Sequence, residues 1–290
     1  MLITVFTPVY NRAYCIRRLY DSLCRQICSN FEWVVVDDGS TDNIDELMQS
    51  FIDEGKMNLR YFKQLNGGKH RAINRGVEEA KGEMFFIVDS DDYISDDAIE
   101  FIISKSTDII NNNTLAGISG IDKTVTGDIV SEFTYDSIDA TSLEIRNKYM
   151  IKGDLAEVYK TRVLKNFPFP EIQGEKFCPE ALIWNRIAHH GYRLRYFPKV
   201  LKIIEYLPDG LTSSIVKIRM RSPVASCSCY SELSQMAVPI KQKVKAAVNY
   251  WRFKFCKSSM KKPSLSSKWV LLAPIGFLMH LNDLRITSKD

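Results

Sequence analysis

Three carboxylates follow a short apolar run in the first third of the chain. The sequence FFIVDSDD occupies residues 85–92, and its acidic side chains are Asp89, Asp91 and Asp92. Carboxylate oxygens suit hard cations, and Mg²⁺ or Mn²⁺ commonly bridges one or two of them to the phosphates of a substrate. The spacing therefore predicts a cation site. The simpler alternative is a solvated turn in which Ser95, Asp96 and Asp97 cap the next helix.

A second acidic pair follows another apolar run. In VVVDDGSTD, at residues 34–42, Asp37 and Asp38 stand between three valines and a turn of Gly, Ser and Thr. The carboxyl ends of parallel strands are where open α/β sheets bind ligands. A carboxylate there can accept a hydrogen bond from a base N–H or a ribose hydroxyl. The two acidic strand ends predict a nucleotide-binding crevice, and a plain turn with an Asx cap is the alternative for the second pair.

Two glycines and three basic residues occur between these acidic motifs. The sequence NGGKHRAINRG at residues 66–76 places Lys69, His70 and Arg71 at the start of a helical pattern. Exposed N–H groups at a helix N-terminus, together with cations, favour an anion. The segment contains neither GxxxxGK[ST] nor GxGxxG, so it supports neither a Walker-type NTPase nor a Rossmann dehydrogenase.

The elements that must position these motifs follow a βαβα order. Apolar runs predict strands, and apolar residues at three- and four-residue spacing predict helices. In the first helix, Ile16, Leu19, Leu23 and Ile27 are expected to form one buried stripe. This order predicts an α/β fold with a mostly parallel central sheet. The expected strands are residues 2–7, 31–36, 59–62 and 115–121, and the expected helices include 44–52, 69–80 and 179–189.

Composition excludes several classes of protein. The 290 residues carry a net charge of only +4, which is too small by itself to indicate a nucleic-acid partner, and we expect none. Seven cysteines form no repeating framework and no zinc-site spacing, which favours a reducing compartment. The first residues show no basic region followed by a cleavage site, so we expect a cytoplasmic protein.

Basic and aromatic residues dominate the chain after Gly210, and we expect a helical region at 211–290. Interleaved lysine, arginine and aromatic side chains on helices can lie at an anionic membrane surface. The same aromatic residues can instead pack on the protein, and the sequence leaves both alternatives open. The apolar run at residues 269–281 is too short to span a bilayer.

Four motifs in order carry a resemblance to a known family. TPVYNR, VVVDDGSTD, GGKHRAINRG and VDSDD, all within residues 7–92, resemble family 2 glycosyltransferases of the GT-A fold. The resemblance implies a GT-A-like nucleotide-diphospho-sugar transferase fold, with residues 1–105 binding the nucleotide sugar and 106–210 the acceptor. It implies an inverting enzyme that uses a UDP-sugar in surface-polysaccharide assembly.

The resemblance also implies roles for single residues. Asp38 would contact the uracil, Asp89 would approach the ribose, and Asp91 would ligate Mg²⁺ or Mn²⁺ on the diphosphate. The residues expected at the nucleotide sugar are Thr7, Pro8, Asp38, Lys69, Asp89 and Ser90.

The sequence around the expected catalytic base departs from the family pattern. Family members usually carry a Glu-Asp pair at the start of a helix, whereas this chain has Pro179, Glu180 and Ala181. Aligning Trp184 with the aromatic residue that often follows the pair places Glu180 at the base. Glu175 is the alternative.

Alternative functions predict sequence motifs that can be looked for in this chain. Within this family, the absence of a QxxRW segment indicates a non-processive enzyme, which transfers one sugar to a saccharide or lipid-linked saccharide. The basic C-terminal region leaves open a location at the inner face of the membrane. A sugar nucleotidyltransferase would carry a glycine-rich loop after the first strand, where this chain has TPVYNR. A non-catalytic nucleotide-sugar-binding protein is the alternative that the missing Glu-Asp pair leaves open.

Overall fold

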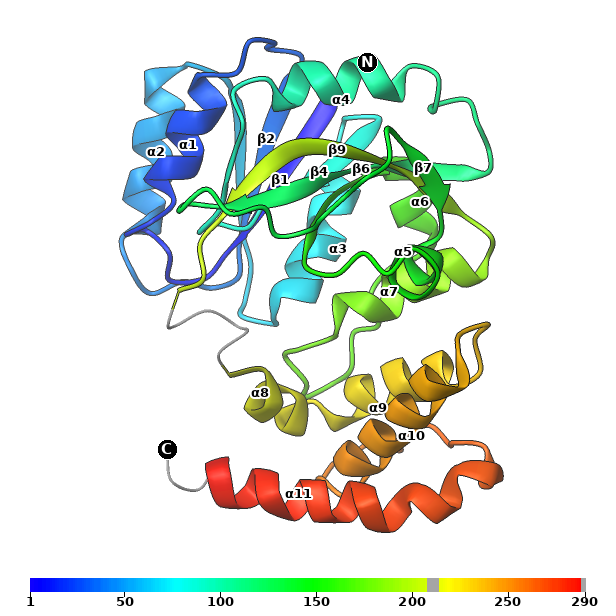
Figure 1. Ribbon diagram of the computed structural model, residues 1–290. Helices are drawn as coiled ribbons and strands as arrows, with labels where there is room; N and C mark the ends of the chain where they lie inside the picture. The colour runs from blue at the N-terminus through cyan, green and yellow to red at the C-terminus, as the bar shows by residue number, and fades with distance from the viewer. Residues whose placement is uncertain (208–213, 288–290) are drawn as a thin grey trace. The chain divides into compact units, whose positions relative to one another are not determined.

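The computed structural model describes residues 1–207 and 214–287 (Figure 1). Its contacts divide the chain into two compact units. Unit 1 consists of Met1–Pro168 and His190–Tyr206, and unit 2 of Phe169–His189 and Leu207–Asp290.

The two units group the chain differently from the three regions expected at 1–105, 106–210 and 211–290. The segment Phe169–His189 lies in the middle of the expected acceptor region, yet it makes its contacts with the C-terminal helices. A bidentate ion pair between Arg186 and Glu232 is one of the interactions that hold it there.

A mixed sheet forms the centre of unit 1. Its strands are β1 (Ile3–Val9), β2 (Phe31–Asp37), β3 (Asn58–Lys63), β4 (Met84–Ile87), β5 (Tyr93–Ile94), β6 (Leu115–Thr124), β7 (Ile138–Ala140), β8 (Leu155–Lys160) and β9 (Arg193–Ile204). The strand order is β3-β2-β1-β4-β8-β6-β9-β5, and β7 pairs with β9. The first four strands are parallel, whereas β8 runs antiparallel to both of its neighbours.

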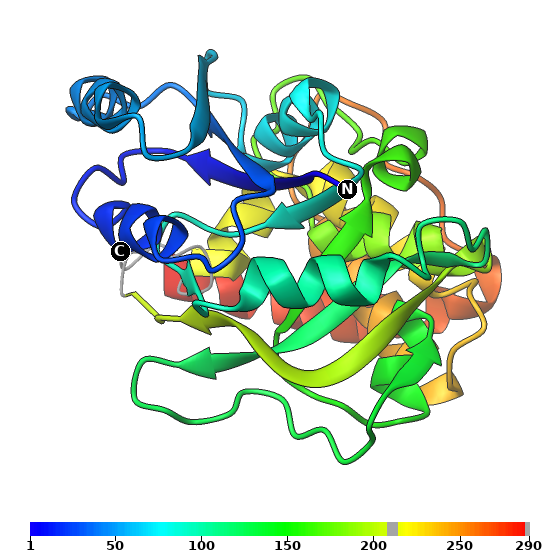
Figure 2. The same ribbon diagram turned by 90° about the horizontal axis from the view of Figure 1, so that it is seen from above.

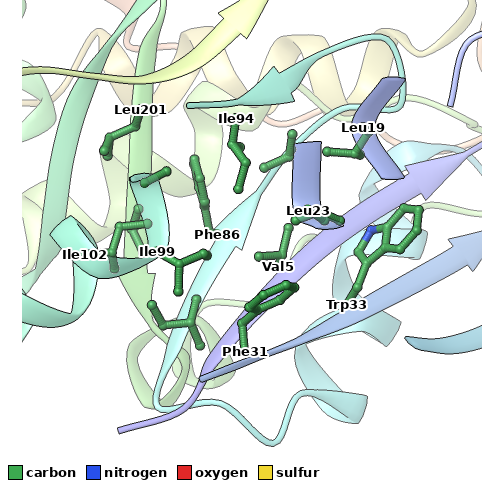
Figure 3. Packing of buried hydrophobic residues seen from close by; sticks show 14 of the residues in the cluster. Val5, Leu19, Leu23, Phe31, Trp33, Phe86, Ile94, Ile99, Ile102 and Leu201 are labelled. Atoms are coloured by element: carbon green, nitrogen blue, oxygen red, sulfur yellow. The ribbon is translucent and has the colours of Figure 1, made fainter. Parts of the chain in front are cut away.

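Helices cover both faces of this sheet, which explains why β1 and β2 are buried along their whole length. Figure 2 shows α3 (Lys69–Glu79) and α4 (Ala98–Ser106) on opposite sides of the strands. On the α4 side, side chains such as Val5, Phe86 and Ile99 share one apolar cluster with α1 (Arg17–Cys24) and α2 (Ile44–Glu54) (Figure 3). Two short helices, α5 (Ser142–Asn147) and α6 (Thr161–Asn166), complete unit 1.

Most expected elements of the first half are confirmed. The strands predicted at 2–7, 31–36 and 59–62, and the helices at 44–52 and 69–80, agree with the structure to within two residues. One member of the predicted stripe is wrong: Ile27 is 67% exposed, because α1 ends at Cys24.

Unit 2 is helical. It contains α7 (Glu180–His189), α8 (Ile215–Arg221), α9 (Pro223–Leu233), α10 (Ile240–Lys254), the 3₁₀ helix η2 (Ser267–Leu272) and α11 (Ala273–Thr287). Cys227, Tyr250, Phe253 and Cys256 form its small apolar core. Within residues 1–207 and 214–287, no helix combines the length and apolar character needed to cross a bilayer.

Candidate active site

The strand order of unit 1 reverses between β1 and β4. From β1 the chain adds β2 and then β3 on one side, and it continues with β4 on the other side. Open α/β sheets bind ligands beyond the carboxyl ends of the strands at such a point. The predicted carboxylates Asp38 and Asp89 follow the carboxyl ends of β2 and β4, so the fold brings both motifs to this edge.

Thr7 and Pro8 both lie inside β1. Both are buried, and the Thr7 hydroxyl accepts a hydrogen bond of 3.0 Å from the indole Nε1 of Trp33. The chain turns later, where Asn11 adopts a φ of 53° and its amide oxygen accepts a 2.7 Å bond from the backbone N–H of Thr41. The predicted contact of Thr7 and Pro8 with a nucleotide stays a prediction, and backbone atoms would have to make it.

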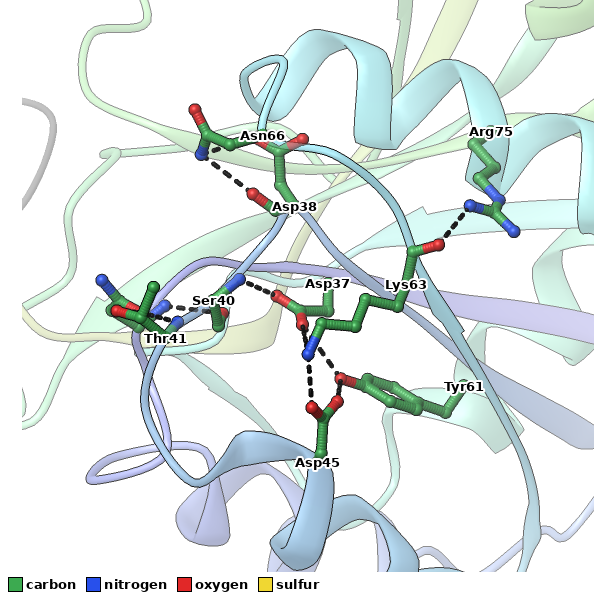
Figure 4. Close-up of polar contacts among 10 residues, drawn as sticks. Asp37, Asp38, Ser40, Thr41, Asp45, Tyr61, Lys63, Asn66 and Arg75 are labelled. Carbon is green, nitrogen blue, oxygen red and sulfur yellow. Dashed lines mark hydrogen bonds and ion pairs between the residues drawn. The ribbon is translucent and has the colours of Figure 1, made fainter.

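Asp37 closes the end of β2. Its carboxylate is fully buried and accepts bonds from the backbone N–H of Ser40 at 2.8 Å and the hydroxyl of Tyr61 at 3.0 Å. The ammonium group of Lys63 lies 3.6 Å away (Figure 4). These partners make Asp37 a structural residue that shapes the turn before Asp38.

Asp38 organises the loop that leads into α3. Asp38 is 4% exposed, and its two carboxylate oxygens accept four hydrogen bonds from that loop. Figure 4 shows Asn66 beside Asp38. The donors are Gln64 Nε2 at 2.8 Å, Asn66 Nδ2 at 3.2 Å, Gly67 N at 2.9 Å and Gly68 N at 2.6 Å. A carboxylate offers about four acceptor positions, so a uracil N–H would have to replace one of these donors. The predicted base contact therefore stays a prediction.

Lys69 and Asp89 form an ion pair across the switch point. Lys69 is the first residue of α3, and its ammonium group lies 2.7 and 2.8 Å from the two carboxylate oxygens of Asp89. Burial alone would raise the pKa of Asp89, but Lys69 and Lys202 outweigh it and hold this pKa below its ordinary value. Asp89 is thus ionised, and its carboxylate oxygens can act as hydrogen-bond acceptors.

Asp91 is half-buried beside this pair. Burial and the charge of Asp89 both raise the pKa of its carboxyl group. A carboxylate destabilised in this way gains from a nearby cation. The preceding residue, Ser90, is 5% exposed, and its backbone carbonyl accepts a bond of 3.5 Å from the thiol of Cys15.

Behind Asp91 lies a buried cluster of charges that the motifs did not predict. The ammonium group of Lys202 in β9 lies 3.4 Å from Asp92 and 3.5 Å from Asp122. Burial raises the pKa of Asp92 to about 7 in spite of Lys202, and burial also raises the pKa of Asp122. For Lys202, burial alone would lower the pKa, but the surrounding carboxylates raise it, so the lysine stays charged.

A weak signal for this cluster was present in the sequence. Asp122 follows the apolar run at 115–121, in the same way that Asp37 follows the valines of β2. Its partner Lys202 is its direct neighbour across the parallel β6–β9 pair. That register depends on residues 80 positions apart and cannot be read from either segment alone.

The acidic edge suits a cation that also takes ligands from a substrate. Among the residues that the structure describes, no three His, Cys, Asp or Glu side chains converge on one position to hold a metal by themselves. Mg²⁺ and Mn²⁺ need only one or two carboxylates when phosphates supply further oxygens. Asp91, destabilised by Asp89 and half-buried, fits this requirement.

The two candidate bases lie in unit 2 and have different surroundings. Glu175 is 5% exposed, and its carboxylate oxygens accept bonds from the backbone N–H groups of Val224 at 2.7 Å and Ala225 at 2.9 Å. It thereby caps the N-terminus of α9. Glu180 is the first residue of α7 and keeps a partly exposed side chain.

Comparison with known proteins decides the family. The sequence profile described as "Glycosyl transferase family 2" matches residues 4–156, more than half of the 290 residues. The chain belongs to glycosyltransferase family 2. Membership of this family favours glycosyl transfer over the sugar nucleotidyltransferase alternative.

Relatives of this family 2 glycosyltransferase occur in several bacteria. An uncharacterized glycosyltransferase of Haemophilus influenzae is 30% identical over 182 residues, which cover 61% of this chain and 69% of that protein. The glycosyltransferase GlyG of Streptococcus pneumoniae is 34% identical over 116 residues, or 39% of this chain and 38% of GlyG. The match thus spans well under half of GlyG.

Solved structures agree on the fold. S. aureus TarS 1–349 in complex with UDP-GlcNAc superimposes with a TM-score of 0.64 and 20% identity, covering 98% of this chain and 90% of that chain. A mannosyltransferase from Pyrobaculum calidifontis in complex with GDP-Man and Mn²⁺ gives a TM-score of 0.57 and 18% identity, covering 96% and 73%. The predicted GT-A-like α/β fold with C-terminal helices is confirmed.

Proposed function

We propose that this glycosyltransferase moves one sugar from a UDP-sugar to a hydroxyl group of a saccharide or lipid-linked saccharide, with inversion at the anomeric carbon. The observation that carries the proposal is the gathering of Asp38, the Lys69–Asp89 pair and Asp91 at the switch point of the sheet. On this proposal, residues 1–105 bind the donor and the following region binds the acceptor.

The donor would be held by the residues at the carboxyl ends of β1, β2 and β4. Asp89, kept ionised by Lys69, is suited to accept a ribose hydroxyl, and Ser90 contributes its backbone. Asp38 supports the loop at residues 64–68, and we propose that this loop and Asp38 together recognise the base. TarS was solved with UDP-GlcNAc, which supports the choice of UDP.

We propose that Asp91 holds Mg²⁺ or Mn²⁺ at the donor diphosphate. The raised pKa of this carboxyl group and the Mn²⁺ in the mannosyltransferase complex support the proposal. When bound, such a cation stabilises the negative charge that develops on the departing nucleoside diphosphate.

Glu180 is proposed as the base. In one displacement, the acceptor oxygen forms a bond to the anomeric carbon while the bond from that carbon to the diphosphate oxygen breaks. Glu180 takes the acceptor hydroxyl proton, and the nucleoside diphosphate leaves with the bonding electron pair. The choice of Glu180 is supported by Glu175, whose two oxygens are already engaged at the N-terminus of α9.

Thermal shift with UDP-, GDP- and dTDP-sugars, each with and without Mn²⁺, tests the proposal because a ligand that binds only the folded state stabilises it. The expected result is a Mn²⁺-dependent shift that is largest for a UDP-sugar. A larger shift with GDP-sugars would overturn the nucleotide assignment. No shift with any nucleotide sugar would overturn the donor site.

We also propose that the enzyme works on the cytoplasmic side of the membrane, where it would meet a lipid-linked acceptor. The support is the charge of the chain, since thirteen lysines and arginines but only two carboxylates lie between residues 214 and 287. Cell fractionation tests this location. Recovery of the protein only outside the cell, or embedded as an integral membrane protein, would contradict it.

A further inference from the structure

Helix α11 buries polar residues and exposes apolar ones. Gly276, His280 and Asp283 lie on one face at four- and three-residue spacing, and this face is buried. An amphipathic helix on the surface of a globular protein shows the opposite pattern. The exposed apolar side chains are Ile275 (50%), Phe277 (42%), Leu278 (67%), Leu281 (40%), Leu284 (45%) and Ile286 (57%).

Specific contacts fix this orientation. Asp283 forms a bidentate ion pair with Arg252 of α10, at 2.5 and 2.6 Å. A side-chain carbon at Gly276 would lie 2.4 Å from the Cβ of Trp251, so only glycine allows the close approach of α11 to α10. Rotating the helix to bury its leucines would break the ion pair and force these backbones apart. The apolar face is therefore exposed as a consequence of how unit 2 is built.

The exposed apolar surface extends beyond α11. In η2, Val270 is 53% and Leu271 is 84% exposed. At the end of α10, Phe255 is 39% exposed and packs edge-on against Phe277, with ring centroids 5.0 Å apart. We call the exposed apolar side chains of η2 and α11, together with Phe255, the α11 face. Eight exposed apolar side chains within residues 270–286, joined by Phe255, are more than the single ones scattered over an ordinary protein surface, and such a concentration marks a site of interaction with a partner or a membrane.

The charge around the α11 face identifies the partner. Between residues 233 and 282 the chain has nine lysines and arginines and no aspartate or glutamate. Lys257, Lys261 and Lys268 are exposed in the segment that joins α10 to α11. Lys254, Lys261 and Lys262 also line a hollow of about 850 Å³ that includes no acidic side chain. Lysine clusters next to an exposed apolar helix complement anionic lipid headgroups.

The size of α11 decides how it would meet a bilayer. Its 15 residues extend about 22 Å, less than the roughly 30 Å of the hydrocarbon core. Figure 1 shows it as one long helix running beside α10 within unit 2. A helix fixed on one side and apolar on the other lies in the plane of the interface, with its leucines below the headgroups.

We propose that the α11 face docks unit 2 on the surface of an anionic lipid bilayer. Leucine and phenylalanine side chains of α11 and η2 enter the interface, and the lysines between α10 and α11 contact the headgroup phosphates. This inference rests on the proposed function, in which the enzyme uses a lipid-linked acceptor, and it adds how the enzyme would reach that acceptor at the membrane surface. It can fail separately from that function, since the test below uses no sugar donor.

The test is co-sedimentation of the 290-residue chain with vesicles of phosphatidylcholine, with or without phosphatidylglycerol. We expect binding only to the anionic vesicles, and weaker binding when salt rises from ~0.1 M to ~0.5 M, because salt screens the lysines. Replacing Leu271 and Leu278 with serine should weaken binding about 10- to 100-fold, since each exposed leucine loses its transfer from water. The matched control is Ile27→Ser in unit 1, because Ile27 and Leu278 are both 67% exposed.

A second variant provides a test that does not depend on whether the leucine variant folds. Replacing Lys257, Lys261 and Lys268 with glutamine should abolish the preference for anionic vesicles without changing the melting temperature. Binding of the leucine variant equal to that of Ile27→Ser would overturn the proposal, as would absence of binding to both kinds of vesicle. Self-association in analytical ultracentrifugation that the leucine variant abolishes, without vesicle binding, would assign the α11 face to a second copy of the chain instead.

Discussion

Replacing Glu175 and Glu180 separately with glutamine separates a structural carboxylate from a catalytic one. Glu175→Gln keeps the size of the side chain but offers one oxygen and one NH₂ group to two backbone N–H donors. One of the bonds from Val224 and Ala225 is then lost, and that buried donor faces another donor. The substitution therefore acts on the N-terminus of α9.

The magnitude follows from the kind of bond. A hydrogen bond to a charged group contributes about 1.5–3 kcal/mol, and an unsatisfied buried donor costs about 1–3 kcal/mol. We expect Glu175→Gln to lower the free energy of unfolding by about 3 kcal/mol, which shifts the melting temperature by roughly 6–12 °C in a protein of this size. Glu180→Gln changes a partly exposed carboxylate in a first helical turn, so its effect should stay below about 1 kcal/mol.

Catalysis should show the reverse order. Loss of a general base lowers kcat by about 10²- to 10⁴-fold, so Glu180→Gln should do this while donor binding persists. Glu175→Gln, assayed below its melting temperature, should retain kcat within about threefold of the parent protein. Melting is followed by circular dichroism, and turnover by release of nucleoside diphosphate from the best donor of the thermal-shift screen.

A clear result would refute this reasoning. If Glu175→Gln melted like the parent protein and lost a hundredfold or more in kcat, Glu175 would be the base and its bonds to α9 would be incidental. Full activity of both variants would remove the base from this part of the chain.

Three further predictions concern unit 1. Asp38→Asn loses at least one charge-assisted hydrogen bond to the loop at 64–68. This substitution should lower the free energy of unfolding by about 2–4 kcal/mol, measured by urea titration. A decrease of less than about 0.5 kcal/mol would contradict the loop-anchoring role of Asp38. Asp91→Asn should weaken donor binding at least ~10-fold by calorimetry with Mn²⁺ but not with EDTA, whereas an unchanged response to Mn²⁺ would remove the metal role. Burial lowers the pKa of Lys160 to about 8, so the unfolded chain holds more protons than the folded chain between pH 8 and 10.5. The free energy of unfolding should therefore rise with pH across that interval, and Lys160→Met should abolish the rise. An identical rise in the variant would show that another group is responsible.

The sequence was sufficient for elements whose signals are local. The strands and helices up to residue 87 follow from short apolar runs and three- or four-residue spacing, each within a single segment. The acidic motifs could be placed on one edge, because parallel strands share the direction of their carboxyl ends. The GT-A-like fold could thus be predicted from the first hundred residues.

Signals that depend on distant register could not be read. Lys202 neutralises Asp92 and Asp122 only because β9 pairs with β6 in parallel, with a register shift next to Asp122. Thr7 was expected to contact the nucleotide sugar, yet its buried hydroxyl accepts a hydrogen bond from Trp33 on the neighbouring strand. The composition of 211–290 left membrane contact and packing equally open, because periodicity says which residues share a face but not which face is buried.

The excursion of the chain into unit 2 has a consequence for the order of folding. The segment Phe169–His189 leaves unit 1, and its contacts are with helices made later in synthesis: Glu175 binds α9, and Arg186 binds Glu232. Unit 1 up to Pro168 already contains β1 to β8 and can begin to pack while the chain is still being made. The α7 helix that carries Glu180 must wait until residues beyond 232 emerge. In a nascent chain, the carboxylates proposed to bind the donor would thus fold into place before the helix that carries the proposed base. A chain that ended between Pro168 and Glu232 would lack the partners of α7.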